Sequence, residues 1–158
     1  IGCGTCKILS YLPDNVRYLG IDRNADYINS AKERYVHRNA EFLNRELTPD
    51  LPLENYKADA VLAIGLIHHL DDHECITLFQ AAKLTLRPGG VFLALDPLYD
   101  PAQSAAARYI ISKDRGKAVR TMEQYMALYT KEFSQIQCDI NPSPLRIPYT
   151  GVAFTCRV

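Results

Sequence analysis

Two glycines and an aspartate near the start of the chain could bind a nucleoside. Gly2 and Gly4 stand in a short turn before a predicted helix, where glycine lets the backbone approach a ligand closely and expose its amides. Asp22 ends the next predicted strand, and a carboxylate there can accept hydrogen bonds from both hydroxyls of a ribose. The succession of glycine turn, strand and acid therefore predicts a site for a nucleoside cofactor.

The spacing of these glycines argues against a dinucleotide. The dinucleotide fingerprint G-x-G-x-x-G would need glycine at position 7, where the chain has Lys7. An NAD-linked oxidoreductase on a similar sheet is therefore the disfavoured alternative. Cys3 and Cys6 share this turn, but the five cysteines are scattered and form no second such pair. We expect reduced thiols, with neither metal nor redox chemistry.

His68 and His69 follow a strongly apolar run and could carry acid–base chemistry. Histidine titrates near neutral pH and could remove a proton from a substrate hydroxyl. The structural alternative is one buried packing histidine beside one surface histidine. His73 lies one helical turn further on, yet no metal site is expected, and Asp71 is predicted to cap a helix.

The elements that position these residues alternate along the first 96 residues. Strands are predicted at 17–22, 40–43, 58–65 and 91–96, and helices at 6–12, 25–36 and 71–86. Another strand should end at the glycine turn, and Thr48 to Tyr56, with its two prolines, is a predicted loop. The run 58–65 is almost continuously apolar, which is typical of a strand buried on both faces. This alternation predicts an α/β, doubly wound, Rossmann-like sheet that is mostly parallel.

The remainder of the chain departs from this alternation. Helices are predicted at 102–112 and 121–133, with Thr121 as a candidate N-cap. Strands are predicted at 135–140 and 152–158, and their connection is too short for a crossover helix. These last two strands should therefore run antiparallel to each other.

Four segments resemble, in the right order, motifs of class I S-adenosylmethionine-dependent methyltransferases of the small-molecule type. They are Ile1-Gly2-Cys3-Gly4-Thr5, Tyr18-Leu19-Gly20-Ile21-Asp22, the run from Ala58 to Leu70, and Leu86-Arg87-Pro88-Gly89-Gly90-Val91-Phe92. Cys6 departs from the pattern because it stands where the first motif has its third glycine. The acid expected just before Ile1 is also absent, so the start of the domain is expected to be incomplete.

The resemblance implies one domain over residues 1–158 and a seven-stranded sheet of order 3-2-1-4-5-7-6, with strand 7 antiparallel. It implies that S-adenosylmethionine lies against the turn at Ile1, Gly2, Cys3 and Gly4. Asp22 would bind the ribose, and Arg23 and Asn44 the adenine. Ile64 and Gly65 would lie beside the adenosine and the sulfonium.

On the acceptor side, the resemblance makes His69, with His68, the candidate catalytic pair. Residues 97–133 would form an inserted lid, with Arg115, Arg120 and Tyr99 binding the acceptor. Arginines and aromatic rings suit an anionic or sugar-like small molecule. The expected reaction is methyl transfer to an O or N atom by in-line displacement, in which the protein aligns the reactants and excludes water. A domain that holds the cofactor without catalysis is the alternative.

Composition and charge restrict the partners. The 158 residues include 18 Lys and Arg against 18 Asp and Glu, and this balance argues against a nucleic-acid or acidic-membrane binder. No apolar run approaches the length of a membrane-spanning helix. A cytoplasmic location is expected from the reduced cysteines, and the oligomeric state is left open.

Overall fold

A computed structural model describes residues 1–48, 51 and 53–158, which fall into two compact units, Ile1–Leu51 and Pro52–Val158. Among these residues, no helix is both long enough and apolar enough to cross a membrane. The predicted loop from Thr48 to Tyr56 includes positions 49, 50 and 52, which lie outside the described residues. Within the rest of that segment, Leu53–Asn55 forms a short 3-10 helix, η2.

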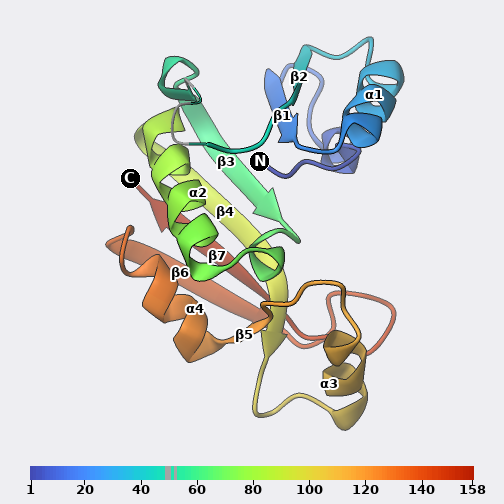
Figure 1. Cartoon of the computed structure of the whole chain (residues 1–158), viewed down its shortest axis with the longest axis vertical. Coiled ribbons are helices and arrows are strands. Elements are labelled where there is room, and N and C mark those ends of the chain that lie inside the picture. The colour runs from blue at the N-terminus through green and yellow to red at the C-terminus, as the bar shows by residue number, and fades with distance from the viewer. Residues whose placement is uncertain (49–50, 52) are drawn as a thin grey trace. The chain divides into compact units, whose positions relative to one another are not determined.

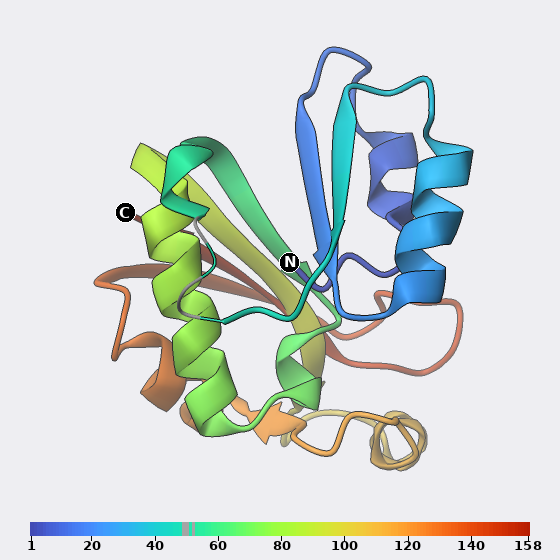
Figure 2. The ribbon, with the colours of Figure 1, turned by 45° about the horizontal axis from the view of Figure 1, so that its top comes forward.

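The first unit is a two-stranded parallel sheet with helices packed beside it (Figure 2). Strand β1 (Tyr18–Asp22) pairs with β2 (Ala40–Asn44), and the register sets the last residues of both strands opposite each other. A 3-10 helix, η1 (Lys7–Tyr11), precedes β1, and helix α1 (Ala25–Arg34) connects the two strands. The parallel pairing places Asp22 and Asn44 together at the carboxyl edge of the sheet, where the sequence predicts the ligand.

Local chemistry explains where α1 begins and which face it buries. The side chain of Asn24 accepts hydrogen bonds from the backbone N–H groups of Asp26 and Tyr27, which satisfies two free donors of the first turn. The buried face of α1 packs with η1 and β2 in one apolar cluster. The buried members of this cluster are Cys6, Leu9, Ile28, Ala31, Tyr35 and Phe42.

The second unit is a mixed sheet of order β3-β4-β7-β6, with the short strand β5 pairing with β4 (Figure 1). Its strands are β3 (Ala58–Ile64), β4 (Leu86–Tyr99), β5 (Arg120–Thr121), β6 (Gln135–Asn141) and β7 (Gly151–Arg157). Its helices are the 3-10 helix η3 (Ile67–His69), α2 (Asp72–Thr85), α3 (Ala105–Ser112) and α4 (Met122–Tyr129). Strands β3 and β4 are parallel, and β7 runs antiparallel to both of its neighbours.

Side-chain caps fix the starts of the helices in this unit. Asp71 and Glu74 form a capping box at α2, and Thr121 and Gln124 form another at α4. Both predicted N-caps, Asp71 and Thr121, are therefore confirmed. Between α2, α4 and the sheet lies a cluster of aromatic rings, in which Phe79 contacts three others; its members are Phe79, Phe92, Tyr129, Phe133 and Phe154.

The strand order is confirmed in two parts, but the single seven-stranded sheet is not found. The pair β2-β1 corresponds to the predicted 3-2, and β3-β4-β7-β6 corresponds to the predicted 4-5-7-6, including an antiparallel strand between the fifth and sixth. The predicted first strand, at the glycine turn, is not a strand among the described residues. The Cys3 N–H donates to the backbone carbonyl of Ile21 at 3.0 Å, which ties the turn to β1 without making it a strand of the sheet.

One further expectation is corrected. Strand β3 is not buried on both faces, because Ala60 and Ile64 are exposed while Val61 and Ala63 are buried. Within the segment 97–133, Tyr125, Leu128 and Tyr129 of α4 and Ala107 and Ile111 of α3 are buried. The role of this segment as a lid stays a prediction.

Candidate functional site

The glycine turn of the first unit is fastened to the tip of β1 by the carboxylate of Asp22. Gly2 and Gly4 adopt left-handed backbone angles, with φ of 61° and 52°, which favour glycine. The N–H of Gly4 donates to Oδ2 of Asp22 at 2.8 Å, and the N–H of Asn24 donates to Oδ1 at 2.9 Å. The structure thus brings together Gly4 and Asp22, two of the residues that the sequence assigns to the cofactor.

Cys6, which stands where the family motif has a glycine, keeps a left-handed backbone conformation. Cys6 has φ of 55°, the left-handed conformation that glycine usually supplies, and its side chain is buried. The sulfur atoms of Cys3 and Cys6 both lie over Gly20, where a Cβ atom would come within 3.1 Å of either sulfur. A hydrogen bond between the two thiols raises the pKa of Cys3 and lowers the pKa of Cys6.

The two predicted adenine contacts lie beside Asp22. The side-chain amide of Asn44 donates to the backbone carbonyl of Asp22 at 3.1 Å, so it holds the tips of β1 and β2 together. Arg23 is exposed and forms a weak ion pair with Glu46 at 4.0 Å. Both side chains are positioned at the carboxyl edge, and their contact with adenine stays a prediction.

In the second unit, the carboxyl ends of β3 and β4 present an apolar pair. Ile64 and Leu95 are register partners, and their side chains are 43% and 41% exposed. Gly65 follows with φ of 62°, and its N–H donates to the carbonyl of Leu95 at 2.7 Å. Exposed apolar surface of this kind at strand ends suits contact with a ligand.

His68 is a buried side chain of this unit with a carboxylate partner. It is 5% exposed, and its Nδ1 lies 2.6 Å from Oδ1 of Asp96, itself 3% exposed. The backbone N–H of His68 donates to the same oxygen at 3.1 Å. Burial raises the pKa of Asp96, although these hydrogen bonds from His68 lower it. The sequence alternative of one buried and one exposed histidine fits the pair, but the buried member is bound to a carboxylate rather than only packed.

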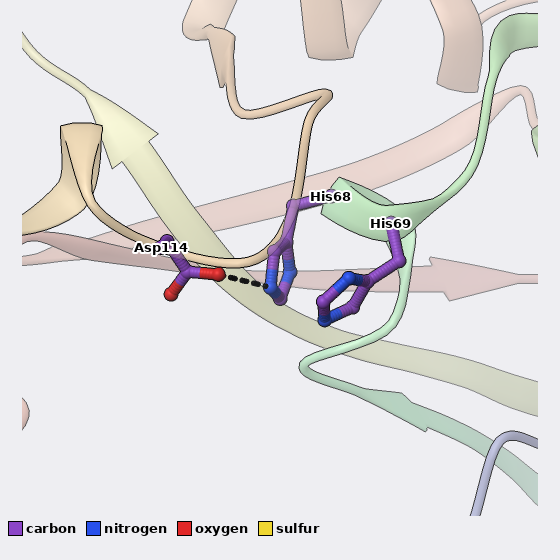
Figure 3. Close-up of side chains that lie close together, drawn as sticks. All are labelled: His68, His69 and Asp114. Carbon is purple, nitrogen blue, oxygen red and sulfur yellow. Dashed lines mark ion pairs between the residues drawn. The ribbon is translucent and has the colours of Figure 1, made fainter.

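Asp114 approaches the opposite edge of the His68 ring, and His69 lies alongside (Figure 3). Nε2 of His68 is 3.3 Å from Oδ1 of Asp114, and the two imidazole rings are 4.1 Å apart between centroids. Desolvation raises the pKa of Asp114, but the Gly116 N–H, the charge of His68 and the Tyr149 hydroxyl together lower it below its usual value.

His69 is exposed, and its pKa is lowered by desolvation and then by the charge of His68. It is therefore in its neutral form over a wider pH range than an ordinary histidine, which is the form that can accept a proton. The positive charge of Arg115 also lowers this pKa, so Arg115 lies near enough to His69 to act on it.

The predicted acceptor residues have different environments. Arg115 is exposed, and Tyr99 is half-buried with the guanidinium of Arg108 5.2 Å from its ring centre. Arg120 is 7% exposed, and its guanidinium donates to the carbonyls of Ile67, Leu70 and Ala118 and to Asp72. Arg120 therefore holds the segment that carries His68, and its contact with an acceptor stays a prediction.

Sequence reasoning missed the partners of His68. Asp96 carried a signal, because it ends a predicted buried strand as Asp22 does. Asp114 carried none, and neither did its own hydrogen-bond partners Gly116 and Tyr149, since all three lie in irregular segments that only the tertiary structure brings to η3.

Solved structures of low sequence identity share the fold of this chain. A SAM-dependent methyltransferase from Methanosarcina mazei superposes with a TM-score of 0.75 at 17% identity, covering 99% of this chain and 89% of that one. The pyocyanin biosynthetic protein PhzM gives a TM-score of 0.76 at 14% identity, covering 99% of this chain and 48% of that one. The fold is therefore the α/β, Rossmann-like methyltransferase fold.

Sequence comparison shows the family. A family model described as "Methyltransferase domain" matches residues 1–90, and the chain belongs to this family, which implies S-adenosylmethionine as the methyl donor. A fatty-acid O-methyltransferase from Mycolicibacterium smegmatis is 37% identical over 105 residues, which make up 63% of this chain and 37% of that protein. The resemblance to class I S-adenosylmethionine-dependent methyltransferases is thereby confirmed. The chain spans little more than a third of that relative's length.

Proposed function

We propose that this chain carries the cofactor-binding and acceptor-activating parts of an S-adenosylmethionine-dependent O-methyltransferase that acts on an anionic small molecule. The observation that carries the proposal is the Asp22 carboxylate, fastened at 2.8 Å to the amide of a left-handed glycine turn. Family membership and the fatty-acid O-methyltransferase relative support the reaction type.

The residues of the turn fit a nucleoside ligand. Apart from Gly4 itself and its two neighbours in the chain, no heavy atom of the described residues lies within 4 Å of the position that a Cβ of Gly4 would take, so the backbone is open on that side. Each oxygen of Asp22 accepts one backbone hydrogen bond, and a carboxylate oxygen has a further lone pair for a ribose hydroxyl. When bound, S-adenosylmethionine supplies an electrophilic methyl group on a sulfonium. Asp22 would hold the ribose, and Ile1, Gly2 and Cys3 would line the turn.

A carboxylate acceptor does not require a general base from the protein. A carboxylate is already ionised at neutral pH, so the protein has only to bind it, orient one oxygen and keep water away. Arg115 is an exposed cation whose charge acts on His69, and it would bind the anionic acceptor. For a hydroxyl or amine acceptor, neutral His69 would instead accept the proton that the acceptor loses. A cytoplasmic site of action is part of the proposal, because all five cysteines are free thiols.

Cofactor binding gives the first test. Asp22→Ala is expected to weaken binding of S-adenosylhomocysteine by about 1–3 kcal/mol, the range for losing hydrogen bonds to a charged group. Isothermal titration calorimetry measures this, with Asp26→Ala as the control because Asp26 is an exposed acid in the same segment. Equal affinities of the two variants, or tight binding of NAD, would contradict the cofactor assignment.

Product formation gives the second test. We expect the full chain, supplied with S-adenosylmethionine, to convert fatty acids to methyl esters that mass spectrometry detects. Matched fatty alcohols and amines separate carboxylate acceptors from hydroxyl and nitrogen acceptors. Binding of S-adenosylhomocysteine without methylation of any acceptor would favour the alternative of a catalytically silent domain.

A further inference from the structure

We infer that His68, His69 and Asp114 form a binding site for a divalent transition-metal ion of the Zn²⁺ kind. One ligand atom from each side chain can be chosen so that all three lie within 4.8 Å of one another. The two histidines come from η3, and Asp114 comes from the segment after α3, so the tertiary fold brings the three together (Figure 3).

The distance between the first two ligand atoms matches a metal site. Nε2 of His68 and Oδ1 of Asp114 are 3.3 Å apart. In a tetrahedral zinc site with bonds of about 2.0–2.1 Å, neighbouring ligand atoms are about 3.3 Å apart. A charge-assisted hydrogen bond between a cation and a carboxylate is shorter, about 2.7–2.9 Å. The observed spacing therefore leaves room for an ion shared by the two side chains.

His68 and Asp114 are held in place by hydrogen bonds to further residues, as metal ligands usually are. Nδ1 of His68 is bound to the buried carboxylate of Asp96 at 2.6 Å, which directs its other nitrogen toward Asp114. A metal-bound histidine commonly donates its second N–H to a carboxylate in this way. Oδ2 of Asp114 accepts the hydroxyl of Tyr149 at 3.3 Å, and Oδ1 accepts the N–H of Gly116. Both inner ligands are thus fixed before an ion arrives.

The charges around His68 also favour a cation. Two carboxylates face opposite edges of one imidazole, with Asp96 at Nδ1 and Asp114 at Nε2. If the Nδ1 proton is donated to Asp96 and Nε2 carries no proton, Nε2 and the Asp114 oxygen are both acceptors, and either a proton on Nε2 or a metal ion between them removes their repulsion. A metal ion in this place satisfies both acceptors, and the neighbouring ring of His69, exposed on one side, supplies a third ligand.

The donor set indicates the class of ion and its use. Two imidazoles and one carboxylate suit Zn²⁺, Co²⁺ or Fe²⁺ better than Mg²⁺, which prefers oxygen ligands throughout. Three protein ligands leave at least one coordination position open. This use rests on the proposed function: the open position would take one carboxylate oxygen of the acceptor and orient it.

Metal binding is measured apart from activity. The full chain is freed of metal with a chelator and titrated with Zn²⁺ by calorimetry. We expect wild type to bind one equivalent that Asp114→Asn and His69→Gln bind at least tenfold more weakly. His73→Gln is the matched control, since His73 is an exposed histidine of α2 outside the cluster, and it should bind as wild type does. Circular dichroism establishes that each variant is folded.

Titration with Co²⁺ separates this site from the cysteines. Co²⁺ held by nitrogen and oxygen gives visible bands without a thiolate charge-transfer band, and these bands should be absent in Asp114→Asn. Equal Zn²⁺ affinity in wild type, Asp114→Asn and His69→Gln would overturn the metal site and leave a histidine held between two carboxylates.

The acceptor role has its own measurement. Addition of decanoate to the Co²⁺-loaded chain should change the visible spectrum, and an unchanged spectrum at saturating decanoate would overturn the role in acceptor binding. Failure of the proposed function is seen separately, as absence of S-adenosylhomocysteine binding in the metal-free chain.

Discussion

Arg120→Ala is expected to lower the free energy of unfolding by about 2–4 kcal/mol, because it removes several hydrogen bonds from a buried, charged guanidinium to backbone carbonyls. The guanidinium of Arg120 donates to Ile67 at 3.2 Å and to Leu70 at 2.9 Å, and both carbonyls belong to the segment that carries the two histidines. The ion pair with Asp72 adds little, since that carboxylate is largely exposed. Loss of the contact between the guanidinium and the ring of Tyr125, 5.9 Å away, adds to the cost.

Arg115→Ala is the matched control for this prediction. Arg115 is an exposed arginine only five positions away, and its removal should change stability by no more than about 0.5 kcal/mol. Urea unfolding measures both variants, and a change in midpoint at constant slope identifies a change in stability. Equal midpoints for the two variants would show that the carbonyls around Arg120 find other donors, and the positioning role would be wrong.

The sequence alone could not predict that Arg120 is buried and Arg115 exposed. Both arginines stand in the segment between β4 and α4, and their residue type and spacing give no reason to treat them differently. The difference arises because β5 pairs with β4 and carries Arg120 under η3, whereas Arg115 lies in an irregular segment. A pairing of only two residues has no periodicity to detect, so no sequence pattern announces it.

The helices and strands can be predicted from the sequence more reliably than these side-chain environments, because each element depends on local chemistry. Asp71 and Thr121 were recognised as helix caps since their side chains satisfy nearby backbone donors, which is a property of a few adjacent residues. The antiparallel β7 followed from a connection too short for a crossover. Burial of β3 on both faces was wrong because an apolar run reports hydrophobicity, while exposure of Ile64 depends on what covers it.

Of the contacts in the candidate site, one could be anticipated from the sequence and another could not. The contact between Gly4 and Asp22 could be anticipated, since both residues lie in motifs whose order along the chain is fixed by the fold. The approach of Asp114 to His68 could not, because it depends on a loop whose backbone returns to η3 through the hydrogen bond from Ala118 N–H to the carbonyl of His68. Loop residues are placed by tertiary contacts, and their sequence alone carries little of that information.

Gly116→Val is expected to destabilise the second unit by about 3 kcal/mol, at the upper end of the usual cost of overpacking. A Cβ atom at position 116 would come within 2.0 Å of Cδ2 of His68 and 2.7 Å of its carbonyl oxygen. The ring cannot move aside without breaking its bond to Asp96, and the carbonyl oxygen belongs to the backbone.

The matched control introduces the same side chain one position along. Lys117 is exposed, so Lys117→Val should change the free energy of unfolding by no more than about 0.5 kcal/mol. Because the displaced group in Gly116→Val is His68 itself, the loss of stability should be accompanied by at least a tenfold loss of Zn²⁺ affinity, measured on the folded variant below its unfolding midpoint. Wild-type stability of Gly116→Val would mean that the loop 114–118 has room to withdraw from η3, and the close packing that holds His68 toward Asp114 would then not exist in solution.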